Sequence, residues 1–185
     1  TYNRLFQQVN VDGFVLMRTR CDDERIRFLT ERGVPFVTQG RTDQSADHAW
    51  IDIDSQQAFS DAVEFLAGKG HRRIAMIAGD ETIYSSTLRE AGYRQGLEKA
   101  GIAVDPDLIF PGDFSAASGR VGVKRVIDSA AGVTAILCAN DATAMGAISQ
   151  AVELGIDVPS QLSVMGYDGV RMAEMFSPPL TTLSH

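Results

Sequence analysis

Short apolar runs alternate along the chain with longer segments in which apolar residues return every three or four positions. The first pattern predicts strands and the second predicts helices. Strands are predicted at residues 11–17, 34–39, 50–53, 73–79, 108–113, 134–140 and 162–167. Helices are predicted at residues 22–32, 54–68, 87–100 and 142–154, and another is predicted to begin at Ser115. This alternation predicts an α/β fold class with parallel sheets.

The spacing of apolar residues also predicts which side of two helices faces the core. In the helix that starts near Asp54, the predicted inner residues are Ala58, Phe59, Ala62, Val63 and Leu66. In the helix that begins at Ser115, the predicted inner residues are Val123, Val126 and Ile127.

The alternation of strand-like and helix-like segments becomes more regular after about residue 53, and this change predicts two lobes. Residues 53–182 contain every segment of a complete βα lobe. Residues 1–52 supply a single strand–helix–strand unit, which cannot cover both faces of a parallel sheet. We therefore expect residues 1–52 to belong to an incomplete N-terminal lobe, whose opening strands and closing helix are missing. Residues 183–185 are expected to form the crossover that returns to that lobe.

Composition narrows the class of protein. Apolar residues make up 44% and charged residues 22% of the chain, which is typical of globular proteins. The formal charge of −7 argues against tight nucleic-acid binding by this segment alone, because such binding depends on Lys and Arg. No apolar run approaches the roughly 20 residues that span a bilayer, and no export signal is visible. Cys21 and Cys138 lie far apart, so we expect a cytoplasmic protein without a metal or cofactor.

Ligands of parallel βα lobes bind at the edge where the carboxyl ends of the strands meet, and this rule selects a candidate pocket. The candidate binding residues at this edge are Arg89, Phe114, Asn140 and Asp168. The matching edge of the partial lobe offers Arg18 and Arg41, both weaker candidates than Arg89. Charged and amide groups bond sugar hydroxyls, and an aromatic ring covers the apolar side of a pyranose. The predicted ligand is therefore a carbohydrate.

Each candidate at the edge of the complete lobe also has a purely structural interpretation. Asn140 and Asp141 precede a helix and can equally be its N-cap. Asp168 can make a turn with the glycine that follows it. Phe114 can be a core residue, and Arg89 a solvated helix residue. These alternatives stay open from the sequence.

Catalytic signatures are absent from the sequence. There is no G-x-S-x-G elbow, no GxxxxGK[ST] phosphate loop, no H-E-x-x-H and no GxGxxG after a strand. The three histidines are scattered, which argues against a metal or catalytic site. A binding protein is favoured over an enzyme. An α/β enzyme that uses its carboxylates as acid and base on a sugar or nucleotide is a competing hypothesis.

Seven stretches, in order and at matching spacing over essentially the whole chain, resemble the LacI/GalR family of transcriptional regulators. They are VDGFVL at 11–16, GVPFV at 33–37, GHRRIA at 70–75, REAGY at 89–93, CANDA at 138–142, SVMGYD at 163–168 and PPLTTL at 178–183. Each stretch is a weak signal alone, and together they are highly specific.

The resemblance implies a type I periplasmic-binding-protein-like fold with two Rossmann-like lobes. It implies that a sugar-like or nucleoside-like effector binds between the lobes. This binding would modulate the affinity of a homodimer for operator DNA, through a helix-turn-helix domain absent from this sequence. The residues that match the family's pocket positions are Arg89, Phe114, Asn140 and Asp168. His185 falls at a position that can also face the cleft. Dimer contacts are expected on the helix after Ser115 and on residues 172–176, whose Met and Phe can equally be core.

Two departures from the family pattern leave the identity of the effector open. The family's GYDD reads GYDG at 166–169, and residues 39–41 read QGR where the family commonly has Asp-Arg. A periplasmic sugar-binding protein of an importer shares the fold and is the alternative function. The GHRRIA stretch at 70–75 favours the regulator.

Overall fold

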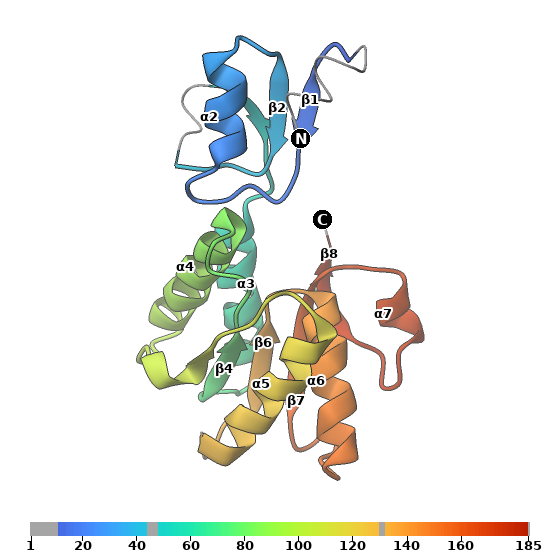
Figure 1. Ribbon diagram of the computed structural model, residues 1–185. Helices are drawn as coiled ribbons and strands as arrows, with labels where there is room; N and C mark the ends of the chain where they lie inside the picture. Colours follow the sequence, from blue (N-terminus) through green and yellow to red (C-terminus); the bar gives the residue numbers. More distant parts are fainter. Residues whose placement is uncertain (1–10, 44–47, 130–131, 185) are drawn as a thin grey trace. The chain divides into compact units, whose positions relative to one another are not determined.

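The computed structural model describes residues 11–43, 48–129 and 132–184. The chain divides into two compact units (Figure 1). Unit 1 comprises residues 1–53 and 82–85, and unit 2 comprises residues 54–81 and 86–185. Each unit contains a parallel sheet, so the predicted α/β fold class is confirmed. None of the helices in these described ranges is long and apolar enough to cross a membrane.

Among the described residues of unit 1, three parallel strands pack with one helix. The strands follow the order β1 (Phe14–Leu16), β2 (Phe36–Gln39) and β3 (Ala49–Ile51). Helix α2 (Glu24–Glu31) begins after Asp23, whose side chain caps it by accepting a hydrogen bond from the Arg25 amide. The buried core of this unit comprises Leu16, Ile26, Leu29 and Val34.

Unit 2 contains a five-stranded parallel sheet in the order β5-β4-β6-β7-β8. Its strands are β4 (Ile74–Ile77), β5 (Ile109–Phe110), β6 (Ala135–Cys138), β7 (Ser163–Asp168) and β8 (Thr181–Ser184). Every residue of β4 and β6 is buried, as expected for the central strands of a sheet that is covered on both faces.

Helices cover both faces of the unit 2 sheet. They are α3 (Ser55–Gly68), α4 (Tyr84–Lys99), the 3₁₀ turn η2 (Pro106–Leu108), α5 (Ala116–Ser129), α6 (Asp141–Glu153) and α7 (Met172–Met175). Residues of α3 and α4, including Phe59, Val63 and Tyr93, form one core against the sheet. Residues of α5 and α6 form the other core, with Val126 and Ile148 among them. The sheet is therefore the middle of three layers (Figure 1).

Strand β8 extends the sheet further than the sequence predicts. The sequence pattern ends the complete lobe at residue 182 and assigns residues 183–185 to a crossover. In the structure Leu183 and Ser184 pair with Tyr167 and Asp168 of β7. Their backbone groups thus find ladder partners inside unit 2.

The prediction for the inner face of α5 is wrong at one residue. Val123 and Val126 are buried, but Ile127 is 42% exposed. A helix turns by about 100° per residue, so the position after Val126 points away from the core that Val126 enters.

Candidate functional site

Arg89 lies at the centre of the candidate site, at the carboxyl end of the unit 2 sheet. Its Nη1 donates a hydrogen bond of 2.7 Å to the carbonyl oxygen of Ala139, just beyond β6. Its guanidinium carbon lies 4.4 Å from the ring centre of Tyr167, 5.4 Å from that of Phe114 and 5.9 Å from that of Phe59. These distances are within the range of cation–π attraction. Arg89 is half-buried, so the interpretation as a solvated helix residue is wrong.

Phe114 is fixed in place by the backbone around it. It has a φ of 69°, a left-handed conformation that non-glycine residues rarely adopt. Its carbonyl oxygen accepts a hydrogen bond of 3.1 Å from Nδ2 of Asn140. Its ring lies against Gly79, where an added Cβ would sit 2.2 Å from Phe114 Cζ. Strained residues of this kind concentrate at functional sites, and Phe114 is half-buried here.

Asn140 is the N-cap of α6. Its Oδ1 accepts a hydrogen bond of 2.9 Å from the amide of Thr143, while its Nδ2 reaches Phe114. The prediction that Asp141 can be this cap is wrong, because Asp141 is the first residue inside the helix and its side chain is fully buried. The cap interpretation of Asn140 is confirmed. A primary amide has a second N–H and a second lone pair beyond these two bonds.

Asp168 ends β7 and begins a sharp turn. Its φ is 130°, and Gly169 follows with a φ of 70°. Asp168 is half-buried and directly follows Tyr167, whose ring contacts Arg89. Strand β7 thus contributes to the same edge of the sheet as Arg89 and Phe114.

Two predicted residues belong to the other unit or fall outside the described residues. Arg18 belongs to unit 1, is exposed, and has a φ of 53°. Its carbonyl oxygen accepts a hydrogen bond of 3.2 Å from Nη2 of Arg25. His185 lies outside the residues that the structure describes. Both remain predictions.

The sequence pattern did not identify two of the rings around Arg89. The sequence predicts Phe59 as a core residue, and it is fully buried while its ring lies 5.9 Å from the guanidinium carbon. The sequence predicts Tyr167 as the last residue of a strand, and it is likewise buried. The signal for Tyr167 was its place immediately before Asp168 at the end of the strand.

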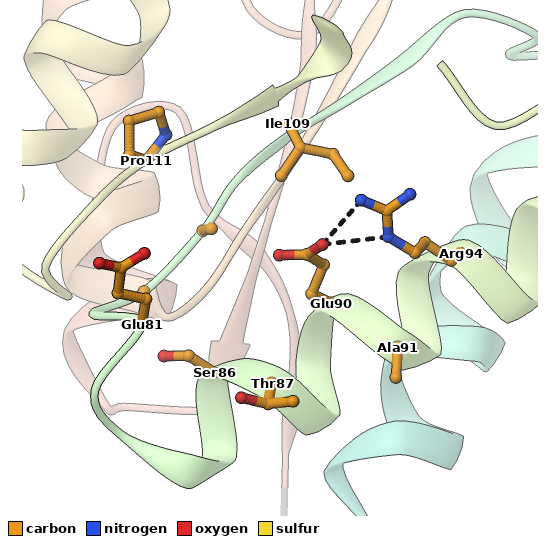
Figure 2. A pocket seen from close by; sticks show the side chains of 10 residues that line it. Glu81, Ser86, Thr87, Glu90, Ala91, Arg94, Ile109 and Pro111 are labelled. Carbon is orange, nitrogen blue, oxygen red and sulfur yellow. Dashed lines mark hydrogen bonds and ion pairs between the residues drawn. The ribbon is translucent and has the colours of Figure 1, made fainter. Parts of the chain in front are cut away.

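A hollow lies beside α4 (Figure 2). Its volume is about 380 Å³. The residues that line it are Ala78, Gly79, Glu81, Ser86, Thr87, Glu90, Ala91, Arg94, Ile109 and Pro111. Arg94 donates hydrogen bonds of 3.0 and 2.8 Å to Glu90 across one helical turn. Gly79 lines this hollow, and it also lies against the ring of Phe114.

Replacing Gly79 with alanine is expected to displace the Phe114 ring. The new Cβ would lie 2.2 Å from Phe114 Cζ and 2.6 Å from Ser86 Oγ. Overpacking of this size costs about 1–3 kcal/mol of unfolding free energy, which urea denaturation measures. In a Phe114→Leu background the same substitution should cost less, because the smaller side chain leaves room. Equal costs in the two backgrounds would show that the ring is not the obstacle.

Comparisons with known proteins identify the family. Residues 63–185 match the description of a periplasmic binding protein-like domain. The transcriptional repressor CytR of Escherichia coli K12 is 33% identical over 184 residues, which cover 100% of this chain and 54% of that protein. A solved LacI-family regulatory protein from Chloroflexus aggregans is 34% identical, with a TM-score of 0.89 over 99% of this chain and 66% of that one. The chain belongs to the LacI family of periplasmic-binding-protein-like domains.

This LacI-family domain spans about half the length of its curated relatives. A PurR repressor of Klebsiella pneumoniae is 35% identical over 98% of this chain and 54% of that protein. A solved structure described as a complex of the regulator CelR with cellobiose is 33% identical, with a TM-score of 0.93 over 100% of this chain and 57% of that one. The family and the two-lobe α/β fold that the sequence motifs imply are therefore confirmed.

Proposed function

We propose that this domain is the effector-binding core of a LacI-family transcriptional regulator. Its ligand would be a sugar-like small molecule, bound at the carboxyl edge of the unit 2 sheet. The observation that carries the proposal is the position of Arg89, whose guanidinium lies among three aromatic rings at this edge. The nearby end of β7 adds Asp168.

The chemistry of this edge suits a polyhydroxylated ring. The guanidinium of Arg89 has five N–H donors in a planar fork, and a carboxylate such as Asp168 accepts hydrogen bonds from hydroxyl groups. The ring of Phe114 offers an apolar face to the C–H side of a sugar. The side chain of Asn140 already bonds two backbone groups, so we expect it to contribute less to ligand binding than Arg89 or Asp168.

The relatives favour a regulator over the competing hypotheses. CytR and PurR are named as transcriptional repressors, and the CelR structure contains cellobiose. These names support neither an importer's binding protein nor an enzyme. The effector would act by binding one conformation of the regulator more tightly and so shifting the population toward it. Operator DNA would be bound by a separate domain of the full-length protein.

A homodimer would form through exposed apolar residues of α5 and α7. Val121 on α5 is 51% exposed, while Met172 and Met175 on α7 are 58% and 76% exposed. Phe176 packs partly buried against the core, so the Met residues of this segment, rather than the Phe, are the candidate contacts. Exposed apolar side chains that gather into a patch are typical of protein interfaces.

The binding proposal is tested by a thermal-shift screen of mono- and disaccharides, cellobiose included, on the full-length protein. A ligand that binds the folded form raises the melting temperature. The Asp168→Ala variant should then bind the selected sugar about 1–3 kcal/mol more weakly, because the hydroxyl groups of the sugar lose the carboxylate that accepts their hydrogen bonds. Calorimetry measures this difference. Unchanged affinity would remove Asp168 from the site.

A further inference from the structure

Asp141 is a fully buried carboxylate that joins three segments of unit 2. It opens helix α6, and no part of its residue surface is exposed. Its Oδ2 accepts a hydrogen bond of 2.8 Å from the backbone amide of Val170. Its Oδ1 accepts one of 2.5 Å from the hydroxyl of Thr182 in β8. Burying a polar group costs free energy unless it is hydrogen-bonded, so these two bonds help to hold the three segments together.

The turn after β7 is held at two consecutive amides. Val170 binds Asp141 directly, and the amide of Gly169 donates a hydrogen bond of 3.3 Å to the Thr182 hydroxyl. Strand β7 also leaves space for the carboxylate, because a Cβ at Gly166 would lie 2.3 Å from Oδ1 of Asp141. A larger residue at position 166 would therefore push the carboxylate off its partners.

The same turn connects Asp168 to helix α7. The amide of Ala173 donates a hydrogen bond of 2.8 Å to the Val170 carbonyl, and the amide of Leu180 donates one of 2.9 Å to the Ala173 carbonyl. Ala173 is 1% exposed, so α7 is anchored to the core at this residue. A continuous series of hydrogen bonds thus runs from Asp141 through Val170 to α7.

We propose that Asp141 is a positioning residue that couples Asp168 to α7. The inference rests on the proposed function, in which Asp168 contacts the effector and α7 belongs to the dimer surface. A change in the backbone of Asp168 must move the peptides of Gly169 and Val170, which are bonded through Asp141 and Thr182. The carboxylate therefore converts an event at the ligand edge into a displacement of α7.

Backbone hydrogen exchange of the full-length protein, without any ligand, tests the first half of this inference. The Asp141→Asn variant keeps one acceptor oxygen and loses the other, so exchange at Gly169, Val170 and Ala173 should be at least about tenfold faster. Thr182→Val should show the same pattern. Tyr93→Phe is the matched control, because it removes a different buried hydrogen bond, the one of 2.7 Å to the Ile74 carbonyl. A merely structural role would speed exchange throughout unit 2 in all three variants, and that result would overturn the inference.

A double-mutant comparison tests the coupling itself. Asp168→Ala should change exchange at Ala173 by about fivefold or more in the wild-type background, and by less than about twofold in the Asp141→Asn background. If Asp141→Asn does not fold, Thr182→Val replaces it as the background. Equal changes in both backgrounds, or no change at Ala173 in either, would overturn the inference. Neither result depends on a sugar, so a failed saccharide screen would count against the proposed function alone.

Discussion

Replacing Gly119 with valine is expected to destabilise unit 2 strongly. Helices α5 and α6 cross there with their backbones in contact, and a Cβ at Gly119 would lie 1.9 Å from the carbonyl oxygen of Thr143. Gly146 faces Ala116 in the same way, with a Cβ position 2.0 Å from its carbonyl oxygen. Neither backbone can move aside without separating the helices, so we expect a loss of about 3 kcal/mol or more. That is a large share of the roughly 5–15 kcal/mol that stabilises a folded protein.

Urea denaturation followed by far-ultraviolet circular dichroism measures this loss. Gly68→Ala is the control, because nothing outside its own helix and its chain neighbours lies within 4 Å of a Cβ built at Gly68. Gly68 is the last residue of α3, where helix propensity acts less strongly than in the interior, so this variant should change stability by less than about 1 kcal/mol. An unfolding free energy of Gly119→Val within about 1 kcal/mol of the wild type would contradict the close crossing of the two helices.

Replacing Arg89 with alanine is expected to remove most of the affinity for the sugar. The side chain binds the Ala139 carbonyl and lies near three rings, so its fork is held in place before a ligand arrives. Losing a half-buried charged hydrogen-bond donor costs about 1–3 kcal/mol, which corresponds to a roughly 5- to 150-fold larger dissociation constant. Arg89→Lys should recover only part of this, because an ammonium group lacks the planar fork.

Calorimetric titration with the sugar selected by the thermal-shift screen measures this effect. Arg94→Ala is the control on the same helix, since Arg94 is paired with Glu90 on the surface. It should leave sugar affinity unchanged and alter stability by about 0–1 kcal/mol. Equal affinities of the Arg89→Ala variant and the wild type would place the ligand elsewhere.

Much of the fold could be predicted from the sequence because parallel α/β proteins have a strong periodic signal. Buried runs such as 74–77 and 135–138 consist of apolar residues, a pattern that predicts central strands. The end of β8 was harder to predict, since Leu183 and Ser184 are indistinguishable by pattern from a crossover segment. Whether a segment pairs with a neighbouring strand depends on tertiary contacts, which the local residue pattern does not reveal.

The candidate site was predicted in outline for a topological reason. Parallel strands bring their carboxyl ends to one edge, so Arg89 and Phe114 could be expected together before any coordinates. The role of Asp141 could not be predicted from the sequence, because a carboxylate just before a helix is usually its N-cap. Only the structure shows that Asn140 has that role and that Asp141 is buried against Val170 and Thr182.

The central claim is that a sugar-like effector binds at the carboxyl edge of the unit 2 sheet. Hydrogen exchange of the full-length protein with and without the selected saccharide tests it directly. We predict slower exchange at residues 113–115, 139–141 and 168–170, the turns that follow β5, β6 and β7. Protection confined to residues 71–73 and 132–134, at the opposite end of the strands, would contradict the account.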